Sequence, residues 1–181
     1  MAKFFTELSP ALQAFIAKQK IFFVASAPDA GRINLSPKGL DTFRILDPNR
    51  VGYLDQTGSG NETAAHARQN GRVTVMFCAF EDAPLILRLY GRGRVIRPQH
   101  DDWSQLRPLF GPAVPGERQL VIVEIESVQT SCGFGVPLYD FRAHRANLIE
   151  HSRKKGPEGT AQYWAEKNTC SIDGLPTGIF E

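Results

Sequence analysis

Short stretches of β-branched and aromatic residues, each bounded by turn-forming residues, constrain the fold of this chain most strongly. Such stretches are too short for helices and rich in residues that favour strands. Six or seven strands are expected within Ile21–Ser26, Ile33–Ser36, Phe43–Leu46, Val51–Leu54, Val73–Phe77, Leu85–Ile96 and Leu120–Val128. Turn sequences such as Pro28-Asp29-Ala30-Gly31 separate them. The pattern predicts a mainly β protein, a closed antiparallel barrel with flanking helices.

The segment Leu85–Ile96 shows the clearest alternation of apolar and polar residues. The apolar face carries Leu85, Leu87, Leu89 and Val95, and the polar face carries Arg88, Tyr90, Arg92 and Arg94. This period of two residues is typical of a strand with one buried face. Gly91 and Gly93 fall on the apolar face, where a missing side chain permits a bend or a close approach of another strand.

Helices are expected where capping residues precede stretches with helical periodicity. Ser9 and Pro10 suit the start of a helix that ends near Gln19. Asn61 is expected to cap a helix over Glu62–Gln69, which Asn70-Gly71 would close in the left-handed conformation. Further helices are predicted around Trp103–Phe110, over Phe141–Lys154 and over Thr160–Lys167.

The length of 181 residues fits a single domain. The barrel is expected over about residues 20–130 and a helical C-terminal extension over about 138–181, with the change of pattern near Cys132–Pro137.

Composition excludes several classes of protein. The net charge of +2 is too small and too evenly spread for a nucleic-acid-binding surface. No run is long and apolar enough to cross a bilayer, and Glu7 stands where a signal peptide would continue its apolar core. The separated Cys78, Cys132 and Cys170 indicate neither a disulfide framework nor a zinc site. We therefore expect a cytoplasmic protein that binds no nucleic acid, membrane or metal ion.

The richest candidate site is the glycine-rich turn Gly58-Ser59-Gly60-Asn61-Glu62-Thr63. A turn entering a helix offers free backbone N–H groups and the positive end of the helix dipole, which suit a phosphate group. Ser59, Asn61 and Thr63 add short hydrogen-bonding side chains. The spacing is neither a dinucleotide-binding fingerprint nor a P-loop. A capped helix after a flexible loop explains the same residues equally well.

The second candidate is Ile33-Asn34-Leu35-Ser36-Pro37-Lys38-Gly39. Pro37 cannot donate to a neighbouring strand, so this strand lies at a sheet edge or ends there. Asn34 and Ser36 share one face, and Lys38 shares it only if the alternation continues past Pro37. The Lys38 ammonium would suit an anionic ring edge or a phosphate. An ordinary solvated edge strand is the simpler interpretation of this segment alone.

Histidine and cysteine give weaker signals. His66 follows Glu62 by one helical turn, a spacing found in metal sites but more often at exposed helix positions. For His144 a surface helix is the simpler interpretation, and Cys132 would be reactive only with a lowered pKa. No Ser/His/Asp or Cys/His set stands out, so no catalytic residue is assigned.

Taken in order, these segments resemble the pyridoxamine 5′-phosphate oxidase-related, FMN-binding split-barrel proteins. The motifs that carry the resemblance are Asn34-Leu35-Ser36-Pro37-Lys38-Gly39, Leu54-Asp55, Gly58-Ser59-Gly60-Asn61-Glu62-Thr63, Asn70-Gly71-Arg72 and Arg88-Leu89-Tyr90-Gly91. Each motif alone is weak, but their order and spacing make the match specific. The resemblance extends from about Phe22 to Val128, and the tail through Ser171-Ile172-Asp173-Gly174-Leu175-Pro176 is similar to the same subgroup.

The resemblance implies a six-stranded antiparallel split barrel and a homodimer with FMN in the cleft between subunits. It places the FMN phosphate at Ser59, Asn61 and Thr63, and the isoalloxazine ring and ribityl chain beside Asn34, Ser36, Pro37 and Lys38. Arg88 is a further candidate contact of the cofactor.

The chain departs from the vitamin B6 oxidase of this family. That oxidase has an Arg-Lys pair where Glu62-Thr63 stand here, a glutamine where Ile86 stands, and a C-terminal Arg-x-His motif with only a loose counterpart in Arg142-Ala143-His144. Neutral donors would therefore hold the phosphate, and the Glu62 charge is expected to turn toward solvent or an arginine.

These departures lead us to expect an FMN-dependent oxidoreductase of an unidentified small molecule, not a true pyridoxamine phosphate oxidase. The alternative is a non-catalytic carrier of a flavin, deazaflavin or haem.

Overall fold

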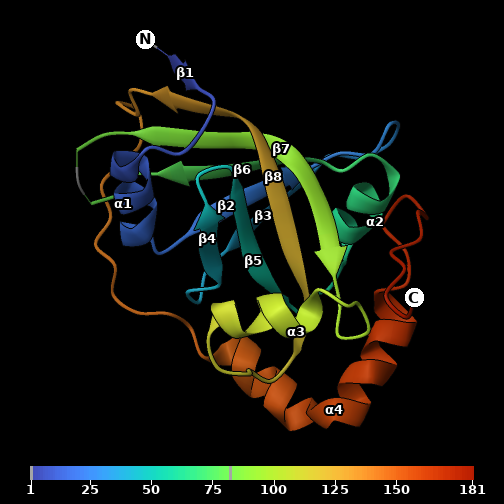
Figure 1. The fold of residues 1–181 in the computed structure, drawn as a ribbon. Coiled ribbons are helices and arrows are strands. Elements are labelled where there is room, and N and C mark those ends of the chain that lie inside the picture. The colour runs from blue at the N-terminus through green and yellow to red at the C-terminus, as the bar shows by residue number, and fades with distance from the viewer. Residues whose placement is uncertain (1, 82) are drawn as a thin grey trace.

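The computed structural model describes residues 2–81 and 83–181. Its strands are β1 (Lys3–Phe5), β2 (Phe22–Ser26), β3 (Asn34–Lys38), β4 (Phe43–Asp47), β5 (Arg50–Gln56), β6 (Arg72–Cys78), β7 (Ile86–Ile96) and β8 (Glu117–Ser131). Its helices are α1 (Pro10–Lys18), α2 (Glu62–Gln69), α3 (Trp103–Leu106), a 3-10 turn (Arg107–Phe110) and α4 (Asn147–Lys167). Figure 1 shows α3 and α4 gathered at one end of the sheet, and α2 beside the C-terminal tail.

All eight strands belong to one antiparallel sheet. Their order is β3-β2-β6-β7-β8-β5-β4, and β1 pairs with β8 through Phe5 and Val128. The mainly β prediction is therefore confirmed. β1 was missed, because three exposed residues give no periodic signal.

The long strands β7 and β8 bend together at a bulge, where their register shifts between Tyr90 and Gly91. A Cβ on Gly91 would lie 2.0 Å from the backbone oxygen of Glu124. Only glycine permits this approach, as predicted for the apolar face of Leu85–Ile96. The bulge helps to curl the sheet around the larger of two hydrophobic clusters.

The predicted closure into a barrel is not seen among the described residues, and the number of strands differs from the predicted six. The sheet has eight strands, and within the described residues its end strands β3 and β4 form no backbone ladder with each other. Side chains pack across the opening instead: the rings of Phe22 on β2, next to the end strand β3, and Phe43 on β4 have centroids 5.0 Å apart. β3 carries Pro37, whose missing N–H restricts it to an edge position.

The core lies inside the curled sheet. Its largest fully buried members include Tyr53, Phe77, Leu87 and Leu89. A second cluster, which includes Leu120, Ile122 and Phe110, packs against Trp103 and Leu106 of α3. On β6, Val73, Val75 and Phe77 point inward, whereas Thr74 and Met76 are half-buried on the outer face.

Helix α2 has the predicted bounds, and Gly71 closes it with a φ of 72°. Asn61 stands at the N-cap position, but its side chain makes no capping hydrogen bond. The predicted helix over Phe141–Lys154 begins only at Asn147, and Gly156, with a φ of 69°, divides α4. Within the described part of the chain, none of the helices has the length and hydropathy needed to span a bilayer.

Candidate functional site

A cavity of about 740 Å³ lies between β3, the turn before α2 and the C-terminal tail. Six of the eight predicted site residues line it: Asn34, Ser36, Lys38, Ser59, Asn61 and Thr63. Pro37 lines a neighbouring groove on the other side of β3. Arg88 lies elsewhere, on the outer face of β7, where its guanidinium donates to the Ser131 hydroxyl at 3.0 Å. Two segments far apart in sequence thus converge on one cavity.

Strand β3 supplies one wall of the cavity. Its alternation continues past Pro37, so that Asn34, Ser36 and Lys38 share one half-buried face while Leu35 and Pro37 face outward. The pairing of β3 with β2 sets this orientation, because Ser36 stands opposite the buried Val24.

The turn before α2 supplies the opposite wall. Its carbonyl oxygens are held by the protein: Arg118 donates to Gly60 at 3.1 Å, and the Asn168 amide donates to Gly58 at 3.3 Å. The backbone N–H groups from Gly58 to Thr63, in contrast, have no acceptor in residues 2–81 and 83–181. Unpaired N–H groups at a helix start form a site suited to an anion.

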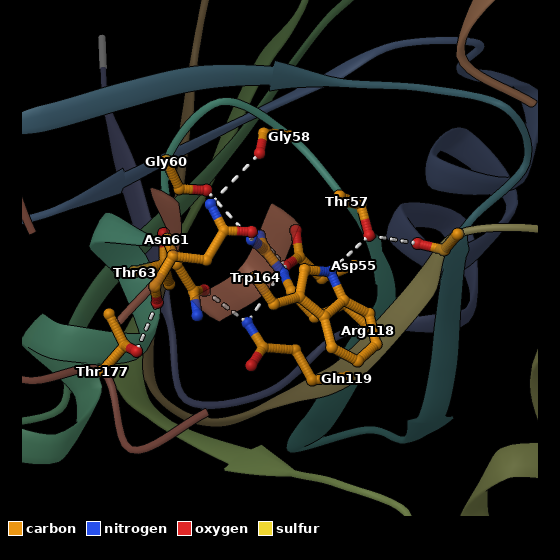
Figure 2. A network of polar contacts seen from close by, with 12 residues as sticks. Asp55, Thr57, Gly58, Gly60, Asn61, Thr63, Arg118, Gln119, Trp164 and Thr177 are labelled. Carbon is orange, nitrogen blue, oxygen red and sulfur yellow. Dashed lines mark hydrogen bonds and ion pairs between the residues drawn. The ribbon is translucent and has the colours of Figure 1, made fainter. Parts of the chain in front are cut away.

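A buried ionic network supports both walls, and Figure 2 shows the part of it that surrounds Asp55 and the turn before α2. The Asp55 carboxylate accepts hydrogen bonds from Lys38 at 2.8 Å, from Arg118 at 2.6 and 3.1 Å, and from Gln119 at 3.0 Å. Burial alone would raise the pKa of the Asp55 carboxyl, but the charges of Arg118 and Lys38 outweigh it and hold the pKa well below its usual range. The lowered pKa favours the ionised carboxylate of Asp55 near neutral pH.

The network changes what Lys38 and Asn61 offer to a ligand. Lys38 lines the cavity, but its ammonium is already paired with Asp55. Asn61 is buried, and its carbonyl oxygen accepts from Gln119 at 2.7 Å. Its Nδ2 has no hydrogen-bond partner among the described residues and is shielded from solvent.

A second polar cluster lies beneath the cavity. The Asn34 amide donates to the Thr63 hydroxyl at 3.2 Å, and the Ser26 hydroxyl lies 2.9 Å from His66 Nδ1. His66 is fully buried, so the expectation of an exposed position was wrong. Burial lowers the pKa of His66, which favours the neutral imidazole. This cluster fixes the start of α2 against β2 and β3.

Glu62 also differs from expectation. Its carboxylate turns neither to solvent nor to an arginine, but accepts the backbone N–H of Ile172 at 3.0 and 3.1 Å. Ser59, in contrast, is exposed and its hydroxyl makes no hydrogen bond within the described residues.

Sequence reasoning missed the supporting residues of the site. Asp55 and Arg118 lie on strands β5 and β8, and Asn168 and Trp164 come from the C-terminal region. Trp164 donates to the Thr57 hydroxyl at 2.8 Å, immediately before the glycine-rich turn. One signal was present: Asp55 directly follows the apolar stretch Val51–Leu54 within β5, where an unpaired carboxylate would be costly.

The fold and the cavity define a mainly β protein with a polar ligand site beside a helix start. The family model described as pyridoxamine 5′-phosphate oxidase matches residues 8–132, more than half of the chain. The chain therefore belongs to the pyridoxamine 5′-phosphate oxidase family, which confirms the resemblance seen in the motifs.

A curated relative supports this assignment. The pyridoxamine 5′-phosphate oxidase family protein ustO of Aspergillus flavus is 40% identical over 195 aligned positions, which cover 97% of this chain and 78% of the relative.

Solved structures share the fold. A protein of Lactobacillus delbrueckii assigned as a pyridoxamine 5′-phosphate oxidase has a TM-score of 0.54 and 21% identity, over 68% of this chain and 94% of that one. A variant of HupZ from Group A Streptococcus has a TM-score of 0.52 and 19% identity, over 68% of this chain and 99% of that one. At these identities the likeness concerns the fold alone.

Proposed function

We propose that the cavity binds FMN and that this chain is an FMN-dependent oxidoreductase of a small molecule. The observation that carries the proposal concerns the turn Gly58–Thr63. Its N–H groups have no acceptor within the described residues, and it lines the cavity together with β3 in a chain of this family.

The cavity fits such a ligand in size and charge. Its volume of about 740 Å³ falls within the range of about 300–1,000 Å³ typical of small-molecule sites. Four cationic side chains line it against two carboxylates: Arg32, Lys38, Arg118 and Lys167 against Asp55 and Glu62. This balance favours an anionic ligand.

The residues divide into two groups by what they offer. The N–H groups of the turn and the Ser59 hydroxyl would bind the phosphate, together with the positive end of α2. The β3 face with Asn34, Ser36 and Lys38 would flank the ribityl chain and the ring. Bound FMN would supply the hydride or electron chemistry, and the protein would supply orientation and electrostatics. True pyridoxamine phosphate oxidation is not proposed, because Glu62 and Thr63 replace the Arg-Lys pair.

We infer that the protein acts as a homodimer. Ile33, just before β3, and Leu35, on its outer face, are 75% and 65% exposed at the rim of the cavity. A partner subunit that covers these two apolar side chains would remove them from water. Arg88 lies on the same outer face of the sheet, so it would reach a cofactor only in the partner's cavity.

The visible spectrum of the purified protein, with mass analysis of what heat releases, tests the ligand. An FMN spectrum and mass are expected, whereas haem or a deazaflavin would contradict the proposal.

A nicotinamide cofactor added anaerobically, followed by an electron acceptor, tests the activity. Repeated reduction and reoxidation of the flavin would support an oxidoreductase, and bound FMN that is never reduced would indicate a carrier.

A further inference from the structure

The four cations that line the cavity differ in their partners. Lys38 and Arg118 pair with Asp55 at 2.8 and 2.6 Å, and Arg32 pairs with Asp173. Lys167 also lines the cavity, and it alone among these four has no hydrogen bond or ion pair within the described residues. Its ammonium is thus the one positive charge at the cavity that no carboxylate of the described chain offsets.

We propose that Lys167 provides the cationic contact for the FMN phosphate, and that Glu62 positions the C-terminal segment that carries it. This inference rests on the proposed binding of FMN. Lys167 lies outside residues 8–132, the part of the chain that matches the family model. The charge that the vitamin B6 oxidase draws from its Arg-Lys pair would here come from the C-terminal extension.

The structure fixes the backbone of Lys167 beside the glycine-rich turn. Lys167 is the last residue of α4, and the next residue, Asn168, is fully buried. Asn168 accepts from Arg118 at 2.8 Å and donates to the Gly58 carbonyl at 3.3 Å. One turn earlier, Trp164 donates to the Thr57 hydroxyl at 2.8 Å. The last turn of α4 is therefore held against the turn that would bind the phosphate.

Glu62 secures the chain beyond Lys167. Its carboxylate accepts the Ile172 N–H, and Asp173 accepts the Arg32 backbone N–H at 2.6 Å. These two contacts dock the tail on both walls of the cavity, at the start of α2 and at the start of β3. Glu62 thus has a structural role that explains an acidic residue beside an anion site.

Binding measurements on the full chain with FMN and riboflavin test the role of Lys167, because riboflavin lacks the phosphate. Lys167→Ala is expected to weaken FMN roughly tenfold, as for a lost hydrogen bond to a charged group, and to leave riboflavin unchanged. Lys167→Arg should retain most of the affinity. The difference in FMN affinity between the wild type and Lys167→Ala should shrink as the ionic strength rises from about 0.1 M to 1 M. Lys154→Ala, an exposed site on the same helix, is the matched control.

The role of Glu62 is tested by two variants that both remove its charge. Glu62→Gln keeps an acceptor for the Ile172 N–H and Glu62→Ala does not. FMN affinity should be lower in Glu62→Ala than in Glu62→Gln, and this difference should disappear when Lys167 is also replaced by alanine.

The outcomes separate the two proposals. A wild-type chain that binds no FMN would overturn the proposed function. FMN binding with Lys167→Ala indistinguishable from Lys154→Ala, or an equal loss of FMN and riboflavin, would overturn only the assignment of Lys167.

Discussion

The carboxylate of Asp55 lies 2.6 Å from the guanidinium of Arg118, and both side chains are buried where β5 pairs with β8. Through Lys38 and the Gly60 carbonyl, this pair connects both walls of the cavity. A charge removed from such a pair leaves its partner buried and uncompensated, which costs about 3–5 kcal/mol.

Asp55→Asn should therefore lower the free energy of unfolding by several kcal/mol, measured by urea denaturation. The matched control is Asp47→Asn, which breaks a partly exposed pair with Arg50 at 3.1 Å. Such surface pairs contribute about 0–1 kcal/mol. Equal effects of the two substitutions would show that the buried network does not stabilise the fold.

The Asp55–Arg118 pair also predicts that the stability of the folded chain depends on pH. The pKa of Asp55 is lower in the folded chain than in the unfolded one, so the unfolded chain binds the proton first as the pH falls. The stabilisation is therefore complete above the unfolded pKa of about 4 and decreases as the pH falls toward the folded value. The stability difference between wild type and Asp55→Asn should shrink below about pH 4. A difference that stays constant from pH 7 to pH 3 would contradict this account.

The exposed outer face of β3 predicts the state of association. The wild-type chain should show twice its mass of 20.1 kDa in light scattering at micromolar concentration. Leu35→Lys, which places a charge on this face, should yield monomers without loss of the fold, because Leu35 is 65% exposed. Leu109→Lys, at a 52% exposed position in the 3-10 turn, should remain dimeric. A monomeric wild type, or two variants that behave alike, would rule out this interface.

Local chemistry made part of the fold predictable. Helix α2 has the predicted bounds because the signals that start and end it, Asn61 and Gly71, lie next to it in sequence. The face shared by Asn34 and Ser36 was also predictable, because side chains alternate between the two faces of a strand.

The parts of the fold and of the site that the sequence did not predict depend on contacts between distant segments. Asp55 meets Gln119 only through the register of β5 against β8, and Glu62 meets Ile172 only when the tail folds back. His66 looked exposed because its helix is short and polar, but the packing of α2 on β2 buries it. Apolar residues such as Phe141 suggested a helix where the chain is exposed and has no regular secondary structure. No local pattern contains this information.

The central claim is that the turn before α2 binds the phosphate of FMN. The most direct test compares the dissociation constants of FMN and riboflavin for the wild type, for Ser59→Ala and for the distant control Ser104→Ala. The wild type should bind FMN more tightly than riboflavin. Ser59→Ala should weaken FMN by roughly tenfold, about 1.4 kcal/mol, and leave riboflavin unchanged. A wild type that binds both flavins equally, or a Ser59→Ala variant that loses affinity for both alike, would contradict the account.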